Sequence, residues 1–285
     1  MKKIIALLVT LNFESQYLKN NTEISVILPD RPRNVDAKNF YSPQRKYPVL
    51  WLLHGTFGDH TDWLRHTNIE LYACENNLIV VMPSALNSDY VNWNGFATGF
   101  RMWDFFTEEL MPLVYAWFPA SDKREDNFIS GLSMGGYGAV MLAVNHPDKF
   151  AAVASLSAAP NDPERIGMPV SGNFEGSDLG LRQKNAIANA GGLEAYRNSN
   201  QNTWRIISRE YSSGALPKMY FAIGREDFLY PSFERFRNHC RENGMTDIVF
   251  DEYGGYTHEW RFWDMTIQKA IRFFGFGEQP DDRVS

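Results

Sequence analysis

The sequence predicts an α/β fold with a mostly parallel central sheet and helices on both of its faces. Short apolar runs recur along the chain, as is typical of strands that are buried on both faces. Segments with helical spacing of apolar residues lie between most of these runs, and such alternation indicates parallel strands. The chain has 285 residues, of which 44% are hydrophobic, so it can bury a sizeable core. We therefore expect a single domain over residues 1–285.

The predicted strands form two groups. Two alternating strands come first, around residues 8–13 and 24–28, and their short connection predicts an antiparallel start. Pro29 ends the second of them, which reads as an edge strand. The other strands are continuous apolar runs, at residues 48–53, 78–82, 128–129, 152–156, 219–223 and 248–250.

The N-terminus has two interpretations. Lys2, Lys3 and the apolar run that starts at Ile4 resemble a short signal peptide. The run is brief, however, and no cleavage site of small residues follows it. We favour a first β-strand in a cytoplasmic protein, with secretion as the alternative.

Helices are predicted where apolar residues recur with a helical period. The clearest covers residues 105–117, with Asp104 as its N-cap and a bend at Pro112. Further helices are predicted at residues 135–145, 233–243 and 263–274.

Residues 159–214 break the alternation of strands and helices. The segment is rich in Asn, Gly, Ser and charged residues, and only short helical pieces are predicted in it, near 181–190, 193–198 and 203–209. A connection of this length is seldom featureless. We expect a small, cap-like helical insertion over the active-site edge of the sheet. A surface excursion without a role is the alternative.

The segment Gly131-Leu132-Ser133-Met134-Gly135 has the Gly-x-Ser-x-Gly pattern of a nucleophile elbow. A predicted strand precedes it and a helix of small residues follows it, which is the context that the pattern requires. The flanking glycines leave room for a very tight corner. Ser133 is the predicted nucleophile, and the helix N-terminus behind it favours negative charge.

A serine hydroxyl needs a base, and the base needs a carboxylate that orients it. In α/β-hydrolases the acid and then the histidine follow the serine along the chain. Of the three histidines after Ser133, His258 lies in a loop between the last predicted strand and the last helix, where the base belongs. His146 and His239 fall at a helix end and on a solvated helix face.

The loop after the strand at 219–223 supplies the acid. Gly224 ends that strand, and Asp227 follows three residues later. Asp227 is the predicted acid, and Glu226 is held in reserve.

An oxyanion hole needs two backbone N–H donors. Met134, directly after the nucleophile, supplies one. The loop after the strand at 48–53 supplies the other, for which we choose Thr56, with Phe57 as the alternative. His54 is expected to brace this loop by hydrogen bonding.

The sequence contains no pattern for a metal or a cofactor, and none is predicted. His54, His60 and His66 are spaced by six residues, which does not place them on one face, and no phosphate-binding loop occurs. Cys74 and Cys240 are predicted to be separate free thiols.

The composition predicts no nucleic-acid partner and no membrane span. The net charge is −6 and the basic residues are scattered, so nothing marks a nucleic-acid footprint. No segment reaches the roughly 20 apolar residues of a membrane span. A small-molecule substrate is expected, and a homo-oligomer is left open.

These motifs resemble the esterase D-like group of α/β-hydrolases over nearly the whole chain. That group includes tributyrin esterases, S-formylglutathione hydrolases, feruloyl and acetyl-xylan esterases, and mycolyltransferases. The resemblance rests on Leu53-His54-Gly55 with Trp63, Glu109-Leu110-Met111-Pro112, the elbow as far as Ala139, Gly224-Arg225-Glu226-Asp227-Phe228-Leu229, and His258-Glu259-Trp260 with Trp263. It implies an α/β-hydrolase fold and a serine carboxylesterase for short acyl chains, with Ser133, Asp227 and His258 as the triad.

The tributyrin esterases are the branch that the chain resembles most. Leu11-Asn12-Phe13 with Ser15, followed by Val26-Ile27-Leu28-Pro29, is similar to the opening of that branch. S-formylglutathione hydrolases usually carry histidines at the positions of Leu132 and Tyr137, which weakens that alternative.

Three other functions compete with a short-chain carboxylesterase. A carbohydrate esterase would remove acetyl or cinnamoyl groups from xylan, with Trp93, Phe96, Phe100 and Trp103 either lining its site or packing in the core. An acyltransferase would use an acceptor other than water. A non-catalytic binding module is disfavoured because all three triad candidates are present.

Overall fold

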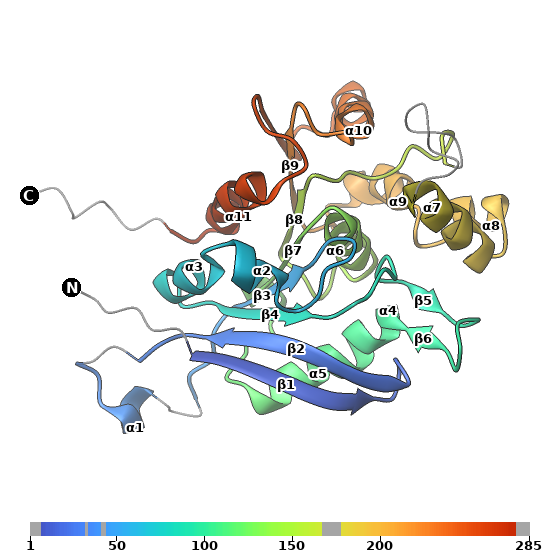
Figure 1. Cartoon of the computed structure of the whole chain (residues 1–285). Coiled ribbons are helices and arrows are strands. Elements are labelled where there is room, and N and C mark those ends of the chain that lie inside the picture. The colour runs from blue at the N-terminus through green and yellow to red at the C-terminus, as the bar shows by residue number, and fades with distance from the viewer. Residues whose placement is uncertain (1–6, 32–33, 41–43, 167–177, 278–285) are drawn as a thin grey trace, which may run out of the picture.

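The computed structural model describes residues 7–31, 34–40, 44–166 and 178–277. Its centre is an eight-stranded sheet with the strand order β1-β2-β4-β3-β7-β8-β9-β10 (Figure 1). These strands are β1 (Leu7–Ser15), β2 (Asn20–Leu28), β3 (Val49–Leu53), β4 (Ile79–Pro83), β7 (Asn127–Leu132), β8 (Ala152–Leu156), β9 (Lys218–Gly224) and β10 (Val249–Tyr253). Each predicted strand, including the first, is found in this sheet.

The sheet is antiparallel only at its beginning. β2 pairs antiparallel with both β1 and β4, and all later neighbours pair parallel. The prediction of an antiparallel start is confirmed, but the prediction that residues 24–28 form an edge strand is wrong. Pro29 lies just beyond the residues that pair with β4, so it removes no hydrogen bond from the ladder.

Two layers of helices cover the two faces of the sheet. On one face, apolar residues of β3, β4, β7 and β9 pack with α5 (Met111–Trp117), α6 (Met134–Asn145), α9 (Thr203–Glu210) and α10 (Tyr230–Glu242). On the other face, the alternate residues of the same strands pack with α2 (Asp62–His66), α3 (Ile69–Glu75) and α11 (Trp260–Phe273). This two-sided burial is why the central strands read as continuous apolar runs.

The helix predicted at 105–117 differs from expectation at its start. Helical structure begins with α4 (Met102–Asp104), continues as a π-helical stretch over 105–110 and ends with α5. Asp104 is therefore inside the helix, where it pairs with Arg101, and it is not the N-cap. Pro112 has no N–H to donate to a carbonyl of the preceding turn. The π-helical stretch, whose turns are wider than those of an α-helix, ends two residues before it.

Several smaller features lie outside the main sheet and its helix layers. The short hairpin of β5 (Asn92–Trp93) and β6 (Phe100–Arg101) was not predicted, because two-residue strands leave no periodic signal. The short helix α1 (Ala37–Phe40) precedes β3. Cys74 and Cys240 are free thiols, as predicted. Among the described residues, no helix is long and apolar enough to cross a membrane.

The 159–214 segment is mostly helical from residue 178 onward. It contains α7 (Asp178–Asn189), α8 (Leu193–Asn198) and α9, close to the predicted pieces. Figure 1 shows these three helices grouped beside α6, and α9 packs directly on α6.

The corner between β7 and α6 has the strained geometry of a nucleophile elbow. Ser133 has φ 52° and ψ −118°, a conformation that costs a non-glycine residue about 1–3 kcal/mol. Its amide donates to Leu156 O at 2.8 Å. A Cβ on Gly135 would lie 2.5 Å from Leu53 O, so α6 approaches the end of β3 as closely as backbone permits.

Gly135→Ala should therefore destabilise the protein, although alanine favours a helix over glycine. The added methyl group would overlap the backbone of β3, and such overpacking costs about 1–3 kcal/mol. Gly95→Ala is the control, because a Cβ there meets nothing within 4 Å. Urea unfolding of both variants tests the difference, and equal stabilities would contradict the proposed contact.

Candidate active site

A cavity of about 480 Å³ opens at the carboxyl ends of the parallel strands. In open α/β sheets this edge is where ligands bind. The loops after β3, β7, β9 and β10 contribute to its wall, together with α2, α7 and α11. Its lining residues are Gly55, Thr56, Phe57, Asp62, Leu132, Ser133, Arg182, Phe228, His258, Trp260 and Trp263.

Asp227 and His258 are directly hydrogen bonded. His258 Nδ1 lies 2.8 Å from Asp227 Oδ2, and Asp227 Oδ1 accepts the Leu229 amide at 2.9 Å. The Asp227 side chain is fully buried, whereas that of His258 is 20% exposed. Because a carboxylate only accepts, Nδ1 carries a proton, and in the neutral imidazole Nε2 is then the acceptor.

Aromatic side chains hold the His258 ring in place. Phe228 lies 4.7 Å from the ring, centroid to centroid, and Trp263 packs edge to face against it at 5.0 Å. Trp263 is itself fixed, since its indole N–H donates to Ser157 Oγ at 3.0 Å.

Ser133 and His258 line the same cavity. The structure thus brings together the three residues that the sequence predicted as a triad. No hydrogen bond joins the Ser133 and His258 side chains, and catalytic hydrogen bonds are often long before a substrate binds.

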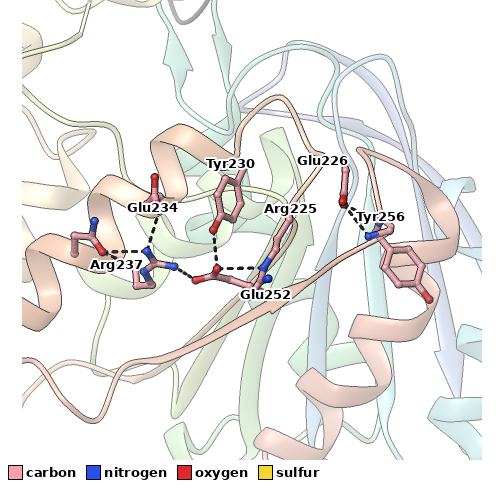
Figure 2. Close-up of polar contacts among 9 residues, drawn as sticks. Arg225, Glu226, Tyr230, Glu234, Arg237, Glu252 and Tyr256 are labelled. Carbon is pink, nitrogen blue, oxygen red and sulfur yellow. Dashed lines mark hydrogen bonds and ion pairs between the residues drawn. The ribbon is translucent and has the colours of Figure 1, made fainter.

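Glu226, the alternative candidate for the acid, binds backbone amides of the His258 loop rather than the His258 ring. Its Oε2 accepts the backbone amides of Gly255 at 2.9 Å and Tyr256 at 3.2 Å. Figure 2 shows this contact between the loop after β9 and the loop that carries His258. The Glu226 amide also donates to Tyr256 O at 3.2 Å, so the two loops are bonded in both directions.

A second carboxylate, Glu252, fastens β10 just before the His258 loop (Figure 2). It accepts from Tyr230 at 2.7 Å, forms an ion pair with Arg237 and lies 3.7 Å from Arg225 Nε. Sequence analysis missed this network, because its members are far apart in the chain and form no motif.

The two candidates for the second oxyanion donor differ in their surroundings. The Phe57 amide already donates to Asn87 Oδ1 at 2.8 Å. The Thr56 amide has no acceptor among the described residues. Met134 begins α6, so no carbonyl one turn earlier in the helix can accept its amide.

His54 braces the loop that carries Thr56, as the sequence predicted. Its Nδ1 lies 2.7 Å from Gly55 O, and its Nε2 accepts the Ala85 amide at 2.9 Å. Tyr90 Oη donates to His54 O at 3.1 Å. The accepting Nε2 requires a neutral ring, and burial lowers the pKa of His54 below its ordinary value.

The other histidines are spread over separate sites. His60 bonds Ser25 Oγ at 2.7 Å and lies 3.3 Å from Glu23, while the His66 ring stacks on Trp260 at 4.5 Å. His146 packs against Trp103, and His239 bonds Ser208. Within the described ranges, no group of three or more His, Cys, Asp or Glu side chains could hold a metal ion.

The aromatic residues suggested for a sugar site do not line this cavity. Phe100 is buried, Trp93 and Trp103 pack against the core, and Phe96 is exposed. The cavity is lined instead by Phe57, Phe228, Trp260 and Trp263. Sequence analysis also missed Asp62 and Arg182, which enter the cavity from α2 and α7.

His54 should make stability depend on pH. Its folded pKa is lowered, so between that value and 6.5 the unfolded chain binds more protons. Stability is therefore lost as pH falls below about 6.5, by at most about 1.4 kcal/mol per pH unit for this one residue. Urea unfolding at pH 7.5 and 5.5 measures the loss. The loss should be smaller in His54→Gln, and an equal loss in both proteins would refute this account.

Comparison with known proteins supports the fold and identifies the family. The "Putative esterase" family model matches residues 15–274. An acetyl esterase of Caldicellulosiruptor saccharolyticus is 31% identical over 265 residues, which cover 92% of this chain and 96% of that protein.

Two solved structures from Staphylococcus aureus are similar over their whole length. The fluorophosphonate-binding serine hydrolase FphF, with substrate bound, has a TM-score of 0.77 and 29% identity, covering 94% of this chain and 98% of FphF. The S-formylglutathione hydrolase FrmB has a TM-score of 0.76 and 28% identity, covering 95% of this chain and 99% of FrmB. The α/β-hydrolase fold is thereby confirmed, and the chain belongs to the esterase family and is a carboxylic ester hydrolase.

Proposed function

We propose that the protein is a serine carboxylesterase that hydrolyses short-chain acyl esters through Ser133, His258 and Asp227. The observation that carries this proposal is the 2.8 Å hydrogen bond between His258 Nδ1 and buried Asp227. In the neutral imidazole this bond places the proton on Nδ1, so that Nε2 can accept a proton in the cavity that Ser133 also lines. That arrangement suits a general base for a serine nucleophile.

The reaction proceeds in two halves. Ser133 Oγ attacks the ester carbonyl carbon while His258 Nε2 takes its proton. The tetrahedral intermediate collapses to an acyl-enzyme, and the same proton passes to the departing alcohol. Water then attacks the acyl carbon while His258 takes its proton. As the second tetrahedral intermediate collapses, His258 returns that proton to Ser133 Oγ and the carboxylic acid is released.

The amides of Met134 and Thr56 are the proposed oxyanion donors. Neither has a competing acceptor in the described part of the chain, whereas the Phe57 amide is bonded to Asn87. Met134 also begins a helix of 12 residues, whose N-terminus favours the negative charge.

The tributyrin esterase branch, with acetyl to butyryl substrates, is our proposal for specificity. Arg182 of the insertion and Trp260 and Trp263 of α11 line the cavity, and an extra methylene that finds no room against such a wall costs contact or strain. The similarity to FrmB makes S-formylglutathione an alternative substrate. However, this chain has Leu132 and Tyr137 at positions where S-formylglutathione hydrolases usually have histidines. We also propose a cytoplasmic location, which the two free thiols support.

A carbohydrate esterase is the second candidate, and one feature of the cavity favours it. Asp62 and Trp260 both line the cavity. A carboxylate next to an indole ring suits sugar hydroxyls and a sugar face. The acetyl esterase relative agrees with acetylated substrates.

Ser133→Ala should abolish ester hydrolysis while the protein stays folded, because His258 then has no hydroxyl to activate. A fluorophosphonate should label Ser133 of the wild type once per chain. Butyryl esters should be hydrolysed faster than octanoyl esters, and acetylated xylan in parallel tests the second candidate. Labelling at another residue, or substantial activity in the variant, would overturn the proposal.

Asp227→Asn and Glu226→Gln separate the two neighbouring acids. Asp227→Asn should lower kcat roughly 10³–10⁴-fold, because the imidazole loses its orienting carboxylate. Glu226→Gln retains an amide oxygen for the His258 loop, so its loss should be about 10-fold or less. A larger loss in Glu226→Gln than in Asp227→Asn would show that the acid is misassigned.

A further inference from the structure

The loop that carries Thr56 depends on one neighbouring segment, residues 85–90 after β4. Ala85 and Tyr90 bond His54 at the beginning of the loop, and Asn87 bonds the Phe57 amide. Thr56 lies between these anchor points, and no residue of segment 85–90 hydrogen bonds to it directly. Its side chain is held from elsewhere.

Arg182 of α7 supplies that contact. Its Nη1 donates to Thr56 Oγ1, across 126 residues of sequence. Its Nε lies 3.1 Å from Asp89 Oδ1, so one guanidinium joins Thr56 to segment 85–90. The Arg182 side chain is only 17% exposed and lines the cavity that contains Ser133.

The backbone around Asp89 is held in an unusual conformation. Leu86, Asp89 and Tyr90 all have positive φ, at 52°, 53° and 58°. Three such residues in five cost free energy, and they persist only where the surroundings enforce them. The buried Tyr90 side chain anchors this turn, which presents the Asp89 carboxylate to Arg182.

The charges argue against a simpler role for Arg182 as a site for an anionic substrate. Asp89 already pairs with the guanidinium, and Asp62 adds a second carboxylate to the cavity. An anionic group would therefore meet no net positive charge there. The pairing instead fixes the position of the guanidinium, and with it the Thr56 hydroxyl.

We propose that Arg182 is a positioning residue, which holds Thr56 so that its backbone amide faces the oxyanion. This inference rests on the proposed function, because it assumes the role of Thr56. It gives the 159–214 insertion a part in catalysis through one side chain. Lysine is a poor substitute, since a single ammonium does not reproduce the planar fork that spans Asp89 and Thr56.

The test is a double-mutant cycle between Arg182→Met and Thr56→Val. Thr56→Val removes the hydroxyl and keeps the backbone amide. Each variant should lower kcat about 10- to 100-fold with little change in KM, because a small misplacement of an oxyanion donor acts mainly on the transition state. The double variant should be no worse than either single variant, and Thr56→Ser should restore most of the activity.

Lys184→Met is the matched control, since it removes one positive charge from an exposed position on the same helix. It should leave kcat within about twofold of the wild type. Fluorophosphonate should still label Ser133 of Arg182→Met once per chain, but more slowly, in proportion to kcat. Failure of wild-type labelling would count against the proposed function rather than against this role.

Two results would overturn the role of Arg182. One is an Arg182→Met variant that retains more than half of the wild-type kcat. The other is a double variant whose loss equals the product of the two single losses, which would mean that Arg182 and Thr56 act independently. Thr56→Val keeps the test decisive if Arg182→Met fails to fold.

Discussion

The close packing of α6 against the ends of β3 and β7 is the constraint on which the site depends. Gly135 lies so near Leu53 O that no Cβ fits between them, and Ser133 takes a strained left-handed conformation as a result. This contact sets three things together: the position of the Ser133 hydroxyl, the direction of the Met134 amide and the point where the Thr56 loop leaves β3. The free energy that the strain costs is offset by burial of α6, most of whose residues are inaccessible to solvent.

The rest of the site consists of loops, and their rigidity comes from polar contacts between them. The acid loop and the histidine loop are joined by the backbone bonds around Glu226 and by the Glu252 network at the base of the histidine loop. The Thr56 loop is tied to segment 85–90 through His54 and Phe57. Since a misplacement of about 1 Å can cost a hundredfold in rate, these contacts matter as much as the residues that they hold.

Sequence alone predicted the strands of the main sheet, the elbow, and Ser133, Asp227 and His258, which the structure brings together. This was possible because each has a local signal: buried strands are continuous apolar runs, and the elbow needs glycines at fixed positions. The helix start was wrongly placed at Asp104 because the helix begins two residues earlier, at Met102, where no typical N-cap residue marks its start. The position of β2 was wrongly predicted because its sequence pattern, an alternating strand followed by a proline, fits an edge strand and the second strand of a sheet equally well.

The contributions of Asp62, Arg182 and Glu226 were beyond sequence reasoning for a different reason. Arg182 is one of 28 basic residues, and nothing in its neighbourhood distinguishes it from those that face solvent. Its meaning arises only when α7 is placed beside a loop 126 residues away. Contacts of this kind depend on tertiary arrangement, which no periodicity records.

Four carboxylate side chains in and near the site have different roles because each has different hydrogen-bond and ion-pair partners. Asp227 is buried and bonded to an imidazole, so its charge orients a base. Glu226, the next residue in the chain, accepts backbone amides and so fixes a loop. Asp89 pairs with a guanidinium, which leaves its charge satisfied and its position fixed. Of these four, only Asp62 lines the cavity, and burial raises its pKa, so it is the carboxylate that a substrate would meet.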